Sequence, residues 1–295
     1  MTEERKQEIL EIIRNTNRRP AQTGKPLYPE EIMAYPNLCE EMESISRTVD
    51  GFSYRMDILR AKNRGENCPL FINIHGGGFI GPHRENDTYF SAYMADQIHG
   101  IAVDLDYTLY PVALHQCMDA LDYVAEHANT WGASAKDISV GGYSAGGALT
   151  AAMGICCAER GGFVPKLQIL CYPPLEYRIP DQYKIDAYDR QIGMERCKAF
   201  ADLYFDDKKE NFEDIHNSPL YAPREILAKQ PKTLILSAGL CNFRYEDEDY
   251  AICLADAGAE VILKRFPEAS HGFIPHFMDG WKEAADLMVR EILEQ

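Results

Sequence analysis

The chain has 295 residues, and its 46 acidic and 30 basic side chains give it a formal net charge of −16. Hydrophobic residues make up 46% and charged residues 26%, which is typical of a globular protein that can bury a sizeable core. An acidic surface repels phosphate backbones and anionic lipid, so we expect neither a nucleic-acid nor a membrane partner. The sequence also has no secretory h-region and no apolar run near the roughly 18 residues of a membrane helix.

Nine cysteines are present, several of them in apolar stretches such as Cys156-Cys157, Cys171 and Cys253. Their number is odd and their spacing is not that of metal ligands. Buried free thiols in a reducing compartment explain them best. We therefore expect a cytoplasmic protein without a bound metal.

In chain order, the sequence predicts a first helix over 3–14 and a β-hairpin over 44–60, turning at Asp50-Gly51. Short apolar runs then alternate with helical segments. The predicted strands are 70–74, 100–107, 137–142, 166–172, 233–238 and 260–266, and the helices are 113–130, 145–159, 246–257 and 278–293. Such alternation is typical of an α/β fold, with a mostly parallel central sheet and helices on both faces. We expect one domain over 1–295.

Residues 176–230 interrupt this alternation with more than fifty positions rich in charges and aromatic rings. A structureless loop of that length is improbable in a compact domain. We expect a helical insertion over the carboxyl edge of the sheet, forming a cap with residues 1–42.

The most informative motif is Gly142-Tyr143-Ser144-Ala145-Gly146-Gly147, between a predicted strand and an Ala-rich helix. This is the G-x-S-x-G pattern in its expected context. The serine of such a motif lies on a strained strand-to-helix turn, and neighbouring glycines let the turn close. We predict that Ser144 is a nucleophile, with the N–H of Ala145 facing a developing oxyanion.

A second motif, His75-Gly76-Gly77-Gly78-Phe79, follows the strand 70–74 directly. Three successive glycines allow backbone N–H groups to approach a negative charge closely, as in an oxyanion hole. A phosphate-binding loop would continue into Lys-Ser or Lys-Thr, which is absent. We therefore expect this glycine loop to contribute to an oxyanion hole, while His75 has a structural role.

A nucleophilic serine needs a general base, and histidine has a suitable pKa. Of the eight histidines, His271 follows the last predicted strand, which fits the order serine, acid, histidine along the chain. We therefore predict His271 as the base.

The ordered motifs resemble the hormone-sensitive lipase family of α/β-hydrolase esterases, from about residue 55 to the C-terminus. They are His75-Gly76-Gly77-Gly78, Asp106-Tyr107, Gly142 to Gly147, Ser218-Pro219-Leu220 and His271-Gly272-Phe273. The resemblance implies a cap, an oxyanion hole formed by the N–H groups of Gly77, Gly78 and Ala145, acyl-enzyme chemistry and no cofactor.

The sequence departs from this family at the third member of the catalytic triad. The family's aspartate lies nine residues before a Tyr-Ala pair, and here that position holds Cys241. Glu246, at the start of the next helix, is our first candidate for the acid, and Asp247 is the second. Asn242 as a neutral hydrogen-bonding partner, or a dyad without an acid, are the remaining alternatives.

These features predict a serine carboxylesterase that acts on short-chain, acetyl-like esters. Phe79 and Tyr143 flank the nucleophile and are our candidates for substrate binding. Two other functions stay open, namely an amidase or peptidase using the same serine, and a ligand-binding protein on a degenerate hydrolase scaffold. We expect a small-molecule ester as the partner, and a homo-oligomer is compatible with the sequence.

Overall fold

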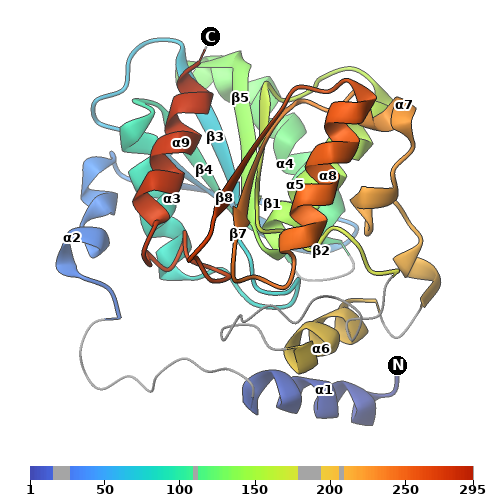
Figure 1. Cartoon of the computed structure of the whole chain (residues 1–295). Coiled ribbons are helices and arrows are strands. Elements are labelled where there is room, and N and C mark those ends of the chain that lie inside the picture. The colour runs from blue at the N-terminus through green and yellow to red at the C-terminus, as the bar shows by residue number, and fades with distance from the viewer. Residues whose placement is uncertain (16–26, 109–111, 179–193, 206–208, 295) are drawn as a thin grey trace.

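The computed structural model describes residues 1–15, 27–108, 112–178, 194–205 and 209–294. Eight strands form one sheet in the order β1-β2-β4-β3-β5-β6-β7-β8 (Figure 1). β2 pairs antiparallel with both β1 and β4, and all other neighbours are parallel. The strands are β1 (Glu43–Val49), β2 (Phe52–Arg60), β3 (Cys68–Ile74), β4 (Ile101–Asp106), β5 (Ala133–Tyr143), β6 (Leu167–Cys171), β7 (Lys232–Ala238) and β8 (Val261–Phe266).

The expected hairpin is formed by β1 and β2, which are joined by Asp50 and Gly51. Both turn residues have a positive φ, 51° and 82°. Two positive φ angles in a two-residue loop match the right-handed twist of the flanking strands, which explains why Asp-Gly is favoured there.

Helices cover both faces of the sheet, as Figure 1 shows. One face carries α3 (Glu85–Gln97) and α9 (Trp281–Leu293), and the other carries α4 (Ala113–His127), α5 (Ala145–Arg160) and α8 (Arg244–Ala257). β3 and β6 are apolar along most of their length because both faces of each strand are buried, and β5 is buried on both faces from Ile138 onward. The prediction of a mostly parallel sheet between two helical layers is confirmed.

The sequence reading did not identify helix α3. Its residues from Phe90 to Ala95 are all buried, because the helix lies between the sheet, α9 and the segment before β1. Polar residues such as Asn86, Asp87 and Ser91 are buried together with the apolar ones, so the helix lacks the 3.6-residue apolar periodicity by which amphipathic helices are recognised.

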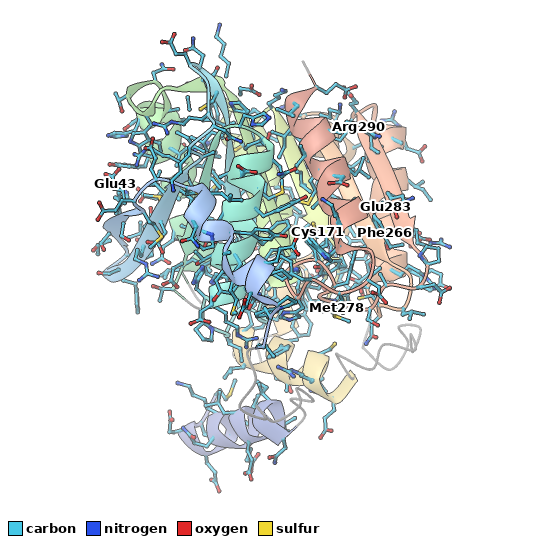
Figure 2. All side chains as sticks on the ribbon, turned by 90° about the vertical axis from the view of Figure 1, so that its left-hand side faces the viewer. Glu43, Cys171, Phe266, Met278, Glu283 and Arg290 are labelled. Carbon is cyan, nitrogen blue, oxygen red and sulfur yellow. The ribbon has the colours of Figure 1, made fainter. Side chains whose placement is uncertain are left out.

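Two further helices, α1 (Glu3–Asn15) and α6 (Met194–Tyr204), lie side by side at one end of the molecule. Figures 1 and 2, which are turned by 90° from each other, both show this pair beyond the end of the sheet. Arg5 of α1 forms an ion pair with Asp202 of α6 at 3.4 Å. Residues 1–42 and 176–230, for which we expect a cap, contribute this pair, whereas residues 16–26, 179–193 and 206–208 lie outside the described residues. The cap stays a prediction.

The remaining short elements pack against the body of the domain. α2 (Glu30–Met33) and the 3₁₀ helix η1 (Tyr35–Leu38) lie beside α3, so this part of the segment 1–42 covers the side of the sheet. The other short elements are the 3₁₀ helices η2 (Ala128–Trp131), η4 (Lys209–Phe212) and η5 (Pro219–Tyr221), and the helix α7 (Arg224–Leu227). Within the described ranges, no helix is both long and apolar enough to span a membrane.

Candidate active site

Ser144 occupies the tight turn between the end of β5 and the start of α5. Its φ of 58° and ψ of −125° lie in a region of backbone conformation that residues other than glycine rarely adopt. The turn is held by the Ser144 N–H, which donates to the carbonyl of Cys171 at the end of β6 (2.9 Å), and by the Ser144 carbonyl, which accepts from Ala148 (3.1 Å). A strained residue that its surroundings fix in this way is a frequent mark of a functional site.

The glycine-rich loop after β3 lies directly against this turn. A Cβ atom at Gly146 would lie 2.0 Å from the Ile74 carbonyl oxygen, and one at Gly76 would lie 2.8 Å from the Tyr143 carbonyl oxygen. The two segments can approach this closely only because neither residue has a side chain. Ala145 is the first residue of α5, so its N–H has no partner within the helix.

His271, in the loop between β8 and α9, faces Ser144 as expected. Its Nε2 lies 2.8 Å from Ser144 Oγ. The imidazole ring is 8% exposed and meets the rings of Tyr172 and Phe243 edge to face, at centroid distances of 5.1 and 5.5 Å. Aromatic packing and the serine contact together fix the orientation of the ring.

Cys241 contacts the other ring nitrogen of His271. Its Sγ lies 3.1 Å from Nδ1, in the loop between β7 and α8, and the side chain is fully buried. The Phe243 N–H donates to the same sulfur at 3.4 Å. This is the sequence position at which the resembling family has its aspartate. The sequence reading located Cys241 there without considering its thiol as the partner of the histidine.

The Oε2 of Glu246, the first candidate for the acid, accepts hydrogen bonds from the backbone N–H groups of Leu175 (2.7 Å) and Glu176 (3.0 Å), beyond the end of β6. Asp247, the second candidate, is fully buried beside Ser237, and burial raises the pKa of its carboxyl well above the usual range. The Cys241 thiol contacts His271 Nδ1. The identity of the acid stays a prediction.

The predicted substrate-binding residues differ in their placement. Tyr143 is 3% exposed, and its hydroxyl donates to Asp87 (2.6 Å) inside the protein, so its side chain does not face a substrate. The side chain points inward because successive residues of a strand point to opposite faces of the sheet. Phe79 is also buried, and its ring stacks on Tyr204 of α6 at a centroid distance of 4.1 Å.

His75 has the structural role that its position suggested. It is buried, its Nδ1 lies 2.6 Å from the Gly76 carbonyl oxygen, and its ring stacks on Tyr107 at 4.2 Å. Burial lowers its pKa to about 4, so the ring is neutral at physiological pH. The Tyr107 hydroxyl donates to the His75 carbonyl (3.0 Å), which fixes the start of the glycine-rich loop 75–84, called the oxyanion loop below.

Helix α6 extends across this site from one loop to the other. A Cβ atom at Gly78 would lie 2.4 Å from the Phe200 ring, and Cys197 Sγ lies 3.8 Å from the Asn242 side-chain amide. Cys197, Phe200 and Tyr204 are spaced by three and four residues, so they share one face of the helix. This face therefore extends across the site, with Phe200 beside the glycine-rich loop after β3 and Cys197 beside the loop between β7 and α8.

No group of three or more His, Cys, Asp or Glu side chains within the described residues is placed to hold a metal ion. None of the nine cysteines forms a disulfide.

Comparisons with known proteins agree with this geometry. A family model described as "alpha/beta hydrolase fold" matches residues 71–275. Esterase LipI of Mycobacterium tuberculosis is 29% identical over 217 residues, which cover 70% of this chain and 66% of LipI, slightly less than two thirds of that relative. A thermostable esterase from Pseudomonas putida has a similar structure, with a TM-score of 0.76, 26% identity and coverage of 98% of this chain and 95% of that one.

A second solved structure shows the same fold at lower identity. It is an esterase from Pyrobaculum calidifontis, with a TM-score of 0.81 and 24% identity over 98% of this chain and 92% of that one. The family match covers more than half of the chain, and the glycine loop, the serine turn and the histidine occupy the places that this fold gives them. The chain therefore belongs to the α/β-hydrolase family, in the branch that contains hormone-sensitive lipase and the carboxylesterases.

Proposed function

We propose that this protein is a serine carboxylesterase that hydrolyses short-chain esters through an acyl-serine intermediate. The observation that carries the proposal is the 2.8 Å contact between Ser144 Oγ and His271 Nε2, at a strained turn beside a glycine loop. A nucleophile within hydrogen-bonding reach of its base is what covalent catalysis requires. The esterase names of the relatives support the same activity.

In the acylation step, Ser144 Oγ attacks the ester carbonyl carbon while His271 Nε2 takes the hydroxyl proton. The carbonyl oxygen becomes an oxyanion and accepts hydrogen bonds from the N–H groups of Gly77, Gly78 and Ala145. The carbon–oxygen bond to the alcohol then breaks, and His271 returns the proton to the departing alkoxide. Water repeats the sequence on the acyl-serine and releases the acid, so no cofactor is needed.

Cys241 takes the position of the orienting acid in this scheme. The His271 Nδ1–H can donate to Cys241 Sγ (3.1 Å), which leaves Nε2 free to accept the serine proton. The Phe243 N–H also donates to Cys241 Sγ (3.4 Å), which fixes the position of the sulfur. A thiol stabilises an imidazolium less well than a carboxylate does, so we infer that this triad turns over more slowly than one with aspartate.

The side chain of Phe200 supports a small acyl group. The leaving alcohol must lie near His271 Nε2, because this atom protonates it. The acyl group then extends away from His271, toward the oxyanion loop, where the Phe200 ring lies against Gly78. A ring at this position leaves room for an acetyl or propionyl group and obstructs a long chain.

Turnover of p-nitrophenyl acetate tests the proposal, with Ser144→Ala and His271→Ala as the decisive variants. We expect wild-type hydrolysis and a loss of about 10⁴-fold or more in kcat in each variant, as for other serine triads. Equal rates for wild type and Ser144→Ala would contradict the proposal. Faster turnover of p-nitroacetanilide than of the ester would instead indicate an amidase, and ligand binding without turnover would indicate a binding protein on this scaffold.

A further inference from the structure

A buried carboxylate links the two segments that form the reacting centre. Asp87 lies in the first turn of α3 and is 4% exposed. Its Oδ1 accepts a hydrogen bond from the Tyr143 hydroxyl (2.6 Å), and its Oδ2 accepts one from the Arg84 N–H (2.8 Å). Tyr143 directly precedes Ser144, and Arg84 closes the loop 75–84 that carries Gly77 and Gly78. One carboxylate therefore spans from the nucleophile turn to the oxyanion loop.

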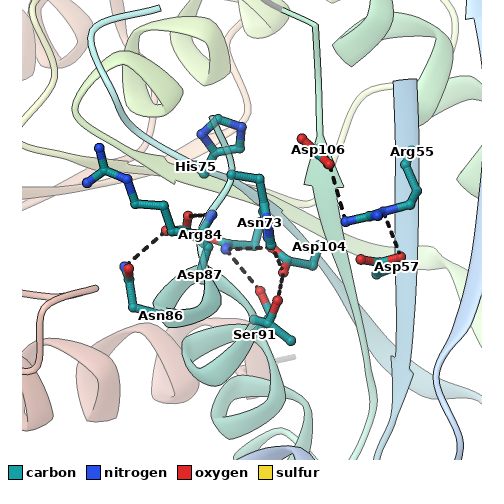
Figure 3. A network of polar contacts seen from close by, with 12 residues as sticks. Arg55, Asp57, Asn73, His75, Arg84, Asn86, Asp87, Ser91, Asp104 and Asp106 are labelled. Atoms are coloured by element: carbon teal, nitrogen blue, oxygen red, sulfur yellow. Dashed lines mark hydrogen bonds and ion pairs between the residues drawn. The ribbon is translucent and has the colours of Figure 1, made fainter. Parts of the chain in front are cut away.

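The hydroxyl of Tyr143 is fixed by a second contact. Because it donates to Asp87, it can accept from the Asn73 side-chain amide (3.4 Å), which also donates to Ser91 (3.0 Å) and Asp104 (3.3 Å). Asn73 lies in β3, two residues before His75, so this contact ties the same turn to the start of the oxyanion loop. Figure 3 shows Asn73, Asp87, Ser91 and Asp104 grouped beneath His75.

A separate ion pair anchors the end of the loop. His83 Nε2 lies 2.7 Å from Asp104 Oδ2, and the Thr88 hydroxyl donates to the same oxygen (3.0 Å). Asp104 raises the pKa of His83 to about 9 against the opposing effect of burial, so this histidine is a cation at neutral pH. The loop is thus fixed at residues 75, 83 and 84, and the oxyanion glycines lie between these points.

The charges that face Asp87 are those of Asp104 and His83, and Tyr143 is the titratable group in contact with it. Burial and the nearby Asp104 carboxylate raise the pKa of Asp87 to about 6. At neutral pH Asp87 is therefore an anion that accepts hydrogen bonds from both the Tyr143 hydroxyl and the Arg84 N–H. A protonated carboxyl carries a hydrogen on one oxygen, so it accepts less well on that side.

We propose that Asp87 is a positioning residue, whose carboxylate fixes the Ser144 turn relative to the oxyanion donors of Gly77 and Gly78. The proposal rests on the esterase function proposed above. The oxyanion exists only in the transition state and the tetrahedral intermediate, so a shift between nucleophile and donors lowers kcat and leaves KM nearly unchanged. A misplacement of about 1 Å can cost about 100-fold in rate.

Asp87→Asn is the primary test, because the amide has nearly the same shape but turns a donor toward either Tyr143 or Arg84. We expect kcat for p-nitrophenyl acetate to fall about 10- to 100-fold, with KM within about twofold of wild type. Tyr143→Phe removes the hydrogen bond between Tyr143 and Asp87 and should lower kcat about 3- to 10-fold. The double variant should be no slower than Asp87→Asn, because both substitutions remove this same hydrogen bond. Tyr143→Phe also keeps the test valid if Asp87→Asn fails to fold.

Asp57→Asn is the matched control. Asp57 is a buried carboxylate at 2% exposure, held by Ser44 (2.6 Å) and Arg55 (3.2 Å) away from the loop. Figure 3 shows it on a neighbouring strand, paired with Arg55. We expect Asp57→Asn to keep kcat within about twofold of wild type, as for substitutions remote from reacting groups.

Inhibition by a trifluoromethyl ketone separates positioning from simple loss of folded protein. This inhibitor forms a tetrahedral adduct with serine and places an oxyanion in the hole, so its Ki should rise in Asp87→Asn by the same factor as kcat/KM falls. A smaller fraction of folded enzyme would lower kcat and leave Ki unchanged. An unchanged Ki, or wild-type kcat in Asp87→Asn, would overturn the proposal, whereas an inactive wild type would instead overturn the esterase function.

Discussion

The two sides of Ser144 are held in different ways. On the oxyanion side, the loop 75–84 is fixed by a network of two carboxylates, Asp87 and Asp104, with the Tyr143 hydroxyl and the charged His83. On the histidine side, His271 is held by two aromatic rings and a thiol. The geometry of the proposed oxyanion hole is therefore fixed by several hydrogen bonds and an ion pair, whereas the proposed general base contacts a thiol in place of a carboxylate.

The largest loss of activity is expected for a substitution at Gly146, where the turn that carries Ser144 lies against the loop after β3. A methyl group there would lie 2.0 Å from the Ile74 carbonyl oxygen and 2.5 Å from that of His75, so the loop or the turn must move. We expect Gly146→Ala to lower kcat/KM by about 10³-fold or more and to lower the Tm by several degrees. Steady-state kinetics and thermal unfolding measure both effects.

Gly65→Ala is the matched control for this substitution, because a Cβ atom at Gly65 would meet no atom within 4 Å. It should leave kcat/KM within about twofold of wild type, as is usual for surface positions. Near-normal activity of Gly146→Ala would show that the contact between turn and loop is far less restrictive than the structure implies.

The second effect concerns the weaker side, at Cys241. Replacing an aspartate by a neutral group in a serine triad costs about 10⁴-fold. We therefore expect Cys241→Asp to raise kcat about 10-fold or more at pH 7, because a carboxylate beside Nδ1 stabilises the imidazolium, and Cys241→Ala to lower it. Stopped-flow or steady-state turnover of p-nitrophenyl acetate measures both.

Cys117→Ala controls for the loss of a buried thiol, since Cys117 lies in the core on α4. Its kcat should match that of wild type. A folded Cys241→Asp that is no faster than wild type, together with an unaffected Cys241→Ala, would remove Cys241 from the catalytic scheme.

Phe200 gives a third effect, which concerns the selectivity between two substrates and leaves the reacting groups in place. Removing the ring beside Gly78 opens space on the oxyanion side. We expect Phe200→Ala to raise kcat/KM for p-nitrophenyl octanoate relative to the acetate by about 10- to 100-fold, the range that a few methylenes are worth in an apolar pocket. Tyr204→Ala, one turn along the same face, removes the stacking partner of Phe79 and should change the ratio less. An unchanged ratio in Phe200→Ala would place the acyl group elsewhere.

The smallest effect concerns stability. The folded-state pKa of His83 is raised to about 9, above its ordinary value of 6.5. Its ion pair with Asp104 is therefore fully present below about pH 6.5 and is lost as the pH rises through about 9. Over this range we expect wild type to lose about 1–3 kcal/mol more unfolding free energy than His83→Gln, measured by urea denaturation. Parallel curves for the two proteins would show that the pair does not stabilise the fold.

The sequence was sufficient for the sheet because each buried strand is a short apolar run between helices, as with Leu70 to Ile74. It was sufficient for Ser144 and His271 as an interacting pair because both motifs follow parallel strands, β5 and β8, whose carboxyl ends lie at the same edge of the sheet. Helix α3 was not predicted, because burial on several sides removes the apolar periodicity by which amphipathic helices are recognised.

The partner of His271 could not be predicted from the sequence alone. Glu246 and Cys241 lie five residues apart, and which of them meets His271 depends on how the loop after β7 turns. Loop conformation of this kind is not encoded in local residue preferences. The inward direction of Tyr143 was in principle recognisable, because it ends a strand whose alternate residues face opposite sides.

Labelling with a fluorophosphonate tests the central claim most directly, because the reagent reacts with an activated serine whatever the natural substrate is. Mass spectrometry of the digested protein should find one phosphonyl group on Ser144 in wild type, much slower labelling in His271→Ala, and none in Ser144→Ala. Labelling of Ser144 at equal rates in wild type and His271→Ala, or no labelling of wild type at Ser144, would contradict the account.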